Sequence, residues 1–246
     1  MSKQLFLWLS LALLPIVGMA QIQSPDDFLP HRLGETFTPH HLLVSYFQHI
    51  AENSDQIQLQ EYGRTYEQRP LMLAVISSAE NMAQIEAIRQ NHLRRNGLAE
   101  GSADPALDRA IVWLSYSVHG NEAAGAESSM GVVYDLTNKS NTDVQEWLEN
   151  TIVILDPSVN PDGYSRYSHW YRGVPPTARD IDPGVREHRE PWPGGRTNHY
   201  MFDLNRDWAW QTQVESQQRI VKYHEWMPHV HADLHEQWYN NPYYFA

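Results

Sequence analysis

The strongest constraint on the fold is the order of three segments in the middle of the chain. Residues 110–118 form a mainly apolar run suited to a buried strand, and residues 122–136 are rich in Ala, Gly and Ser, as in a helix packed closely against a sheet. Residues 151–155 form a second apolar run. A strand, a helix and a strand in this order predict a βαβ unit, and therefore a largely parallel sheet covered by helices.

The flanking segments add further elements to that unit. Residues 57–62 and 71–76 are predicted to be strands on either side of a polar turn. A capping box at Thr212 and Glu215 predicts the start of a helix that ends before Pro228. Apolar residues at helical spacing predict two more helices, over residues 39–50 and 82–94.

Two later segments are unusual. Residues 156–203 contain many prolines and glycines and six arginines, and no periodicity persists, so we expect a long loop that is either functional or disordered. Residues 229–236 are a strand candidate in which apolar residues occupy one face. The other face carries only polar residues, namely His229, His231, Asp233 and His235.

The composition excludes several classes of site and partner. The 246 residues include no cysteine, which excludes disulfides, thiol nucleophiles and cysteine zinc sites, so any metal must be bound by His, Asp and Glu. The chain has 18 basic and 30 acidic residues, a net charge of −12. An acidic surface repels polyanions, so we expect no nucleic-acid partner and no electrostatic attraction to anionic lipid.

Residues 1–20 have the pattern of a secretory signal peptide. Lys3 precedes an apolar run over residues 5–17, and small residues stand before the expected cleavage after Ala20. An uncleaved anchor is the alternative, but Ser10 and Pro15 interrupt the run, which is shorter than the ~20 apolar residues of a membrane span. We expect a protein exported to the periplasm or the medium, without membrane contact after cleavage, whose residues 21–246 form one domain.

Residues suited to metal chemistry follow the first apolar run. A histidine and a glutamate three positions apart, His119 and Glu122, stand where a strand gives way to a helix, and ligands collect at the carboxyl ends of parallel strands. Alone, this motif is most often a polar turn. Three further motifs come later in the chain: Asn160-Pro161-Asp162-Gly163, Asp203-Leu204-Asn205-Arg206, and His235.

In this order and spacing, the four motifs resemble those of the M14 (carboxypeptidase A-like) zinc carboxypeptidases, over roughly residues 57–246. The resemblance implies an α/β fold of three layers, α/β/α, around a mostly parallel mixed sheet. It also implies that His119, Glu122 and His235 bind one Zn²⁺ and leave the fourth position to water, which is the arrangement of a catalytic zinc site.

The resemblance also assigns roles to four other residues. Asp203 accepts a hydrogen bond from the first zinc-binding histidine. Asn205 and Arg206 bind the C-terminal carboxylate of a peptide or protein substrate. Arg172 corresponds to the arginine that stabilises the developing oxyanion, although Arg166 or an arginine of the following loop is an alternative.

The choice of the third ligand rests on context. His235 is preferred to His231 because Asp-Leu-His-Glu followed by the aromatic stretch 238–245 resembles the family's third-ligand strand. His229 and His231 lie further back along the strand, at ~3.3 Å per residue. Asp233 is either a partner of the metal site or an ordinary buried carboxylate.

The resemblance places the general base of the family, a glutamate, beyond Ala246, because Glu236 should face away from the metal. We therefore expect a truncated product of a longer enzyme, poorly soluble and inactive, that retains zinc. Two alternatives stay open. One is a zinc deacylase of the aspartoacylase and succinylglutamate desuccinylase type, which has similar HGNE and DLNR elements. The other is a non-catalytic module that binds zinc or peptide. Tyr164 after Asn-Pro-Asp-Gly favours a peptidase.

Overall fold

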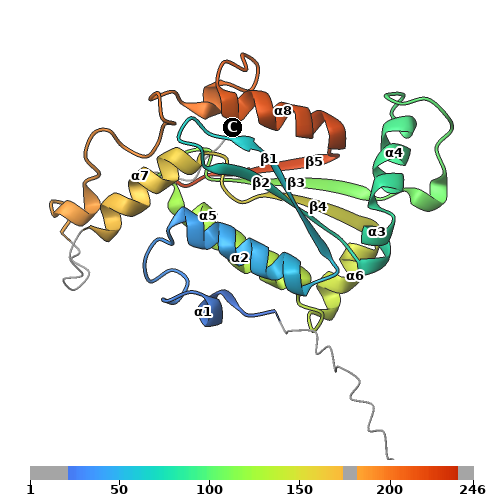
Figure 1. Ribbon diagram of the computed structural model, residues 1–246, viewed down its shortest axis with the longest axis horizontal. Coiled ribbons are helices and arrows are strands. Elements are labelled where there is room, and N and C mark those ends of the chain that lie inside the picture. Colours follow the sequence, from blue (N-terminus) through green and yellow to red (C-terminus); the bar gives the residue numbers. More distant parts are fainter. Residues whose placement is uncertain (1–21, 174–181, 238–246) are drawn as a thin grey trace, which may run out of the picture.

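A five-stranded mixed sheet is the centre of the computed structural model, which describes residues 22–173 and 182–237 (Figure 1). The sheet order is β1-β2-β4-β3-β5. Its strands are β1 Ile57–Arg64, β2 Pro70–Ile76, β3 Ala110–Tyr116, β4 Thr151–Asp156 and β5 Val230–Leu234. The predicted signal peptide, residues 1–20, lies outside the described residues.

The two halves of the sheet differ in strand direction. β3 pairs in parallel with both β4 and β5, whereas β1 with β2 and β2 with β4 are antiparallel. Helix α5, Ala123–Thr137, and helix α6, Thr142–Asn150, connect β3 to the adjacent β4. This connection is the predicted βαβ unit, and the predicted mixed α/β fold is confirmed.

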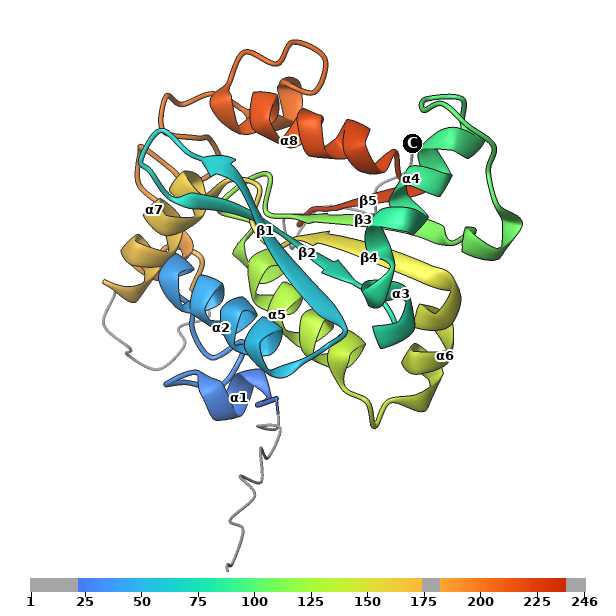
Figure 2. The ribbon, with the colours of Figure 1, turned by 45° about the vertical axis from the view of Figure 1, so that its right-hand side comes forward.

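Helices cover both faces of the sheet and give three layers (Figure 2). On one side lie α1 Pro25–Phe28, α2 His40–Asn53, α5, α6 and α7 Pro161–Arg172. On the other side lie α3 Ala79–Ala83, α4 Ile85–Arg95 and α8 Val214–Trp226. Each layer buries its own apolar cluster against the sheet.

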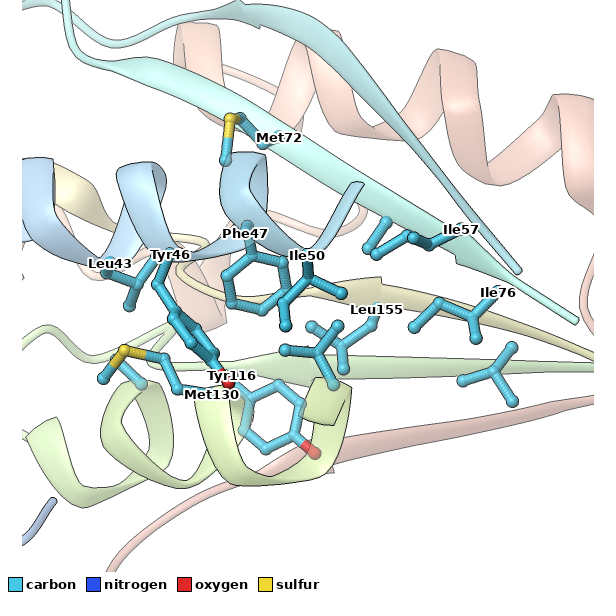
Figure 3. Close-up of a cluster of buried hydrophobic side chains, with 14 of the residues drawn as sticks. Leu43, Tyr46, Phe47, Ile50, Ile57, Met72, Ile76, Tyr116, Met130 and Leu155 are labelled. Atoms are coloured by element: carbon cyan, nitrogen blue, oxygen red, sulfur yellow. The ribbon is translucent and has the colours of Figure 1, made fainter. Parts of the chain in front are cut away.

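Alternation along the central strands supplies both clusters. In β2, Met72 and Ile76 pack towards α2 and α5, while Leu73 packs on the opposite face. Figure 3 shows the first cluster, in which Tyr46 and Phe47 of α2 face the sheet. Because both faces of the central strands are covered, these strands are apolar throughout rather than half polar.

The segment 156–203, predicted to be one long loop, contains helix α7. The signals for this helix are local. Asn160 caps its first turn by accepting a hydrogen bond from the N–H of Gly163, and Pro161 occupies the first helical position. The prediction of an irregular loop was therefore wrong for residues 161–172.

The capping box predicted at Thr212 and Glu215 is also wrong. Helix α8 begins at Val214, and the carboxylate of Asp207 accepts hydrogen bonds from the backbone N–H and the hydroxyl of Thr212. Asp207 therefore accepts the backbone N–H of Thr212, which the side chain of Glu215 would accept in a capping box.

Within residues 22–173 and 182–237, no helix combines the length and the apolar character needed to cross a membrane.

Candidate metal centre

The parallel half of the sheet brings the candidate residues to one edge. β3, β4 and β5 end at Tyr116, Asp156 and Leu234, and a motif follows each strand. Because parallel strands end on the same side, these three segments converge there. β3 ends where Ser117 adopts a left-handed conformation, with φ of 52°, which turns the chain towards His119.

Three glycines allow the segments to touch. A Cβ atom on Gly120 would lie 2.1 Å from the backbone nitrogen of Tyr164 and 2.6 Å from the carbonyl oxygen of Gly195. A Cβ on Gly163 would lie 2.3 Å from that same carbonyl oxygen. The motif after β3, the first turn of α7 and the loop at Gly195 therefore pack backbone against backbone.

Asn160 connects the same segments through hydrogen bonds. Its side chain is fully buried, and its Nδ2 lies 3.4 Å from the carbonyl oxygen of Val118 and 3.3 Å from that of Arg196. Its Oδ1 accepts the α7 capping bond. One amide therefore fixes the positions of the residue before His119 and of Arg196.

The three predicted metal ligands lie together. One ligand atom from each of His119, Glu122 and His235 can be chosen so that all lie within 4.8 Å of one another. Nδ1 of His119 is 2.8 Å from Oε1 of Glu122, and Nδ1 of His235 is 2.9 Å from Oε2. His119 is buried, Glu122 is partly buried and His235 is more open, so the site faces solvent from one side.

Asp203 holds the far side of the first histidine. Its Oδ1 lies 3.0 Å from Nε2 of His119 and accepts the backbone N–H of Asn205 at 2.9 Å. A carboxylate at Nε2 keeps the proton on that nitrogen, so Nδ1 offers a lone pair towards Glu122. In that tautomer Nδ1 is free to bind a metal ion, whereas a proton on Nδ1 makes the 2.8 Å contact with Glu122 a hydrogen bond.

The pKa values of the acidic residues reflect these contacts. Burial acts to raise the pKa of Glu122, but hydrogen bonds from His119, His235 and the backbone of Glu236 outweigh it and lower this pKa to about 2. Burial likewise opposes the shift at Asp203, where His119 and Arg196 lower the pKa. Both groups are therefore carboxylates at neutral pH, as metal coordination and its support require.

The predicted substrate clamp lies beside the third ligand. Leu204–Arg206 is a short 3₁₀ turn, and Asp203 caps it. Nδ2 of Asn205 is 3.5 Å from Nε2 of His235. The side chain of Arg206 is exposed, and its Nη1 donates to the carbonyl oxygen of Asn205.

Arg172 does not lie with the ligands. It ends α7, where its Nη1 lies 3.4 Å from the carbonyl oxygen of Phe37, and it borders a pocket of about 630 Å³ between α2 and α7. Among the described residues, Arg196 lies beside the candidate ligands, with guanidinium nitrogens 3.2 Å from Asp203 and 3.6 Å from Glu122. Arg166, the named alternative, binds the carbonyl oxygens of Gly194 and Asn198 and so supports the loop that carries Arg196.

Two glutamates complete the surroundings of the site. The carboxylate of Glu190 accepts hydrogen bonds from the backbone N–H of Gly195 and from Asn121. The side chain of Glu236 turns to α5 and accepts the N–H of Ala124 at 2.7 Å, while its own N–H donates to Glu122. No sequence motif predicts the contacts of Glu190 with Asn121 or of Glu236 with Ala124, because each joins residues more than 60 positions apart.

His231 and His229 occupy separate positions along β5. Nε2 of His231 lies 3.0 Å from the hydroxyl of Ser115, and Nδ1 of His229 accepts the N–H of Ile111. The aromatic stretch 238–245, which favoured His235 as the third ligand, lies outside the described residues.

Comparisons with known proteins agree with this geometry. The sequence of a carboxypeptidase from Arthroderma benhamiae, described as probable carboxypeptidase 2, is 26% identical over 137 residues, which are 54% of this chain and 20% of that protein. The metallo-carboxypeptidase from Burkholderia cenocepacia has a TM-score of 0.56 at 17% identity, covering 80% of this chain and 40% of that one. Carboxypeptidase A from Helicoverpa armigera has a TM-score of 0.55 at 16% identity, covering 82% and 46%.

The chain thus spans about a fifth of the curated relative and less than half of each of these two structures. A family model described as zinc carboxypeptidase, Peptidase_M14, matches residues 43–230, which is more than half of the chain. The chain belongs to the M14 zinc carboxypeptidase family.

Proposed function

We propose that this chain is the zinc-binding part of an exported metallocarboxypeptidase that hydrolyses the last peptide bond of peptides or proteins. The observation that carries the proposal is the convergence of His119, Glu122 and His235 within 4.8 Å at the carboxyl edge of the parallel strands. The family membership supports the same reaction. Export is inferred from the pattern of residues 1–20.

The donor set suits zinc. Two imidazole nitrogens and one carboxylate are ligands that Zn²⁺ accepts in catalytic sites, and three protein ligands leave one position open. When bound, one Zn²⁺ supplies a Lewis acid that polarises a carbonyl and lowers the pKa of a water molecule. Asp203 holds His119 so that Nδ1 faces the other two ligands.

The surrounding residues of the chain suit a peptide C-terminus. Arg206 offers an exposed guanidinium beside Asn205, and a guanidinium binds a carboxylate through two parallel charge-assisted bonds. We assign to Arg196, rather than Arg172, the role of donating hydrogen bonds to the oxyanion that develops on the scissile carbonyl. Its place between Glu122 and Asp203 supports this assignment.

The proposal is tested by binding and hydrolysis together. The 246-residue chain is loaded with one equivalent of Zn²⁺ and titrated with a peptide that has either a free or an amidated C-terminus. We expect one zinc per chain and at least tenfold tighter binding of the free peptide, because the amide lacks the charge that Arg206 recognises. Arg206→Ala should remove the preference, and Arg64→Ala, an exposed arginine on β1, should not.

The peptide titration measures binding alone, so its result does not depend on which residue acts as the general base. Release of the C-terminal residue is followed in parallel. Any turnover should need zinc and a free C-terminus, and an N-acyl amino acid should be neither bound nor cleaved. Failure of the parent chain to bind zinc, or equal affinity for the two peptides, would contradict the proposal. Cleavage of the N-acyl amino acid alone would assign the chain to the deacylases instead.

A further inference from the structure

A row of polar side chains lies beneath the metal centre, on the face of the sheet that α8 covers. Ser115 of β3 pairs in register with Asp156 of β4 on one side and Asp233 of β5 on the other. Residues in register on parallel strands point to the same face. Ser115 and Asp156 are fully buried, and both lie at the carboxyl end of their strands. Two carboxylates therefore enter a largely apolar layer.

Arg219 of α8 is the buried cation of this layer. Its side chain is only 2% exposed, and its guanidinium carbon lies 4.1 Å from the centre of the Trp208 ring. Burial raises the pKa of Asp156 to about 7, although the charge of Arg219 and a hydrogen bond from Tyr62 oppose this shift. The charges of Arg219 and Asp233 both act on Asp156 and on His231. Arg219 and the two acidic residues therefore belong to one electrostatically connected layer.

The buried polar atoms of this layer are incompletely paired within the described part of the chain. Oδ1 of Asp156, Oδ1 of Asp233, and Nε and Nη1 of Arg219 have no hydrogen-bond partner there. Charged acceptors and charged donors occur together, so each kind of group can compensate the other directly or through bridging water. Removal of the Arg219 guanidinium alone, or of the carboxyl groups alone, would leave the remaining groups buried and uncompensated, which lowers the free energy of unfolding.

Asp233 connects this layer to the third ligand. Its Oδ2 lies 3.4 Å from Nε2 of His235, whose Nδ1 faces Glu122. The arrangement repeats that of the first ligand, where Asp203 lies at Nε2 of His119. We propose that Arg219 and Asp233 are positioning residues for the metal site: Arg219 supplies the buried counter-charge, and Asp233 holds the Nε2–H of His235 so that Nδ1 faces the ion.

This inference rests on the proposed zinc site, and it differs from the alternative in which Asn205 holds the same nitrogen. Nδ2 of Asn205 is 3.5 Å from Nε2 of His235, and an amide donor would need that nitrogen unprotonated. The two arrangements therefore place the imidazole proton on different nitrogens. In the first, loss of the Asp233 charge weakens metal binding; in the second it does not.

The test measures zinc affinity by competition with a chelator, and the hydrogen bond at Nε2 of His235 by ¹⁵N NMR of the zinc-loaded chain, on the full 246-residue chain. Asp233→Asn should lower the zinc affinity 10- to 100-fold and shift the Nε2 resonance of His235 in the zinc-loaded form. Arg219→Met should lower the affinity by about tenfold. The double variant should be no weaker than the weaker single variant, since both act through one connection.

Matched controls are Lys222→Met, one turn away on α8 in an ion pair with Glu225, and Asp135→Asn at an exposed position of α5. Both should bind zinc as the parent does. If Arg219→Met does not fold, the equally uncharged Arg219→Gln takes its place in the same cycle. An affinity of Asp233→Asn within twofold of the parent, or losses that multiply in the double variant, would overturn the inference. Absence of zinc binding by the parent would instead contradict the proposed function itself.

Discussion

Glu122 joins two segments of the candidate metal centre. Its two oxygens face His119 and His235, and one of them also accepts the backbone N–H of Glu236. A single carboxylate thus connects the turn after β3 with the segment after β5. Its loss should therefore affect the whole ligand set rather than one contact.

Glu122→Gln is predicted to lower zinc affinity by more than about a hundredfold, because removal of residues that only support a ligand costs 10- to 100-fold. The neutral amide keeps the shape of the side chain but not its charge. Glu146→Gln on the exposed face of α6 is the control. Competition with a chelating dye measures both variants, and equal affinity for Glu122→Gln and the parent would exclude Glu122 as a ligand.

Substitution of Arg196 and substitution of Arg172 should have different effects on the binding of a transition-state analogue. Arg196→Ala should weaken binding of a peptide phosphonate, an analogue of the tetrahedral transition state, by about 2.7 to 4 kcal/mol, the usual cost of removing an oxyanion donor. Arg172→Ala should change it little, because Arg172 lies at the far end of α7. Calorimetric titration of both zinc-loaded variants measures the two affinities. A larger loss of affinity in Arg172→Ala than in Arg196→Ala would assign the oxyanion role to Arg172.

The convergence of the three candidate ligands was predictable from the sequence, but the position of Arg196 beside them was not. His119, Glu122 and His235 each follow a strand, so strand order alone brings them to one edge of the sheet. Arg196 stands in an irregular segment, where its position depends on the contacts of Asn160 and Arg166 with the loop. Such long-range contacts leave no pattern in the sequence.

At the scale of elements, close backbone packing positions the site. The turn after β3, the start of α7 and the loop at Gly195 meet where any Cβ atom would collide with backbone atoms. The sequence predicted the strands from their apolar runs, but it did not predict α7. Its apolar residues are mostly tyrosines, and its start is recognisable chiefly from the cap at Asn160.

Gly120→Ala is predicted to destabilise the fold by about 2 kcal/mol or more, because the new methyl group would lie 2.1 Å from the backbone nitrogen of Tyr164. Gly131→Ala inside α5 is the control, since its methyl group meets only Leu33 at 3.7 Å. That variant should gain up to about 1 kcal/mol from helix propensity. Urea unfolding measures both, and equal stabilities would show that the three segments do not pack as described.

Helix α2 makes the stability of the fold dependent on pH through His40. Burial, followed by the charges of Arg69 and His41, lowers the pKa of His40 to about 3. The unfolded chain takes up a proton near pH 6.5, whereas the folded chain does not, so stability is lost as the pH falls below about 6.5.

Between pH 7.5 and pH 5 this residue should cost the fold about 2 kcal/mol. His40→Gln should therefore show a flatter dependence of unfolding free energy on pH than the parent, while His41→Gln, whose side chain is exposed, should follow the parent. Denaturant titrations at the two pH values measure the difference. Parallel pH profiles for the parent and His40→Gln would show that His40 is not held neutral.

At the scale of the whole molecule, the metal centre depends on the complete sheet. Glu122 and His235 are 113 positions apart and become neighbours only when β3 and β5 pair. The fold class followed from the strand–helix–strand order, which local apolar patterns reveal. The antiparallel pairing of β2 with β4 depends on contacts distant in sequence, and no such pattern specified it.

Zinc is therefore predicted to stabilise the fold as well as the site. A ligand that binds only the folded chain adds about 4 kcal/mol at a concentration a thousandfold above its dissociation constant. The urea midpoint of the parent should rise with zinc, and that of His119→Ala should not. Equal midpoints with and without zinc in the parent would mean that the folded chain does not bind the ion preferentially.

X-ray absorption spectroscopy of the zinc-loaded chain tests the metal centre most directly. We expect one zinc per chain with nitrogen and oxygen ligands at about 2.0 to 2.2 Å, two of them imidazoles. In His235→Ala the signal of one imidazole should disappear. Two imidazoles still bound in that variant, or a purely hydrated ion in the parent, would show that zinc does not bind at His119, Glu122 and His235.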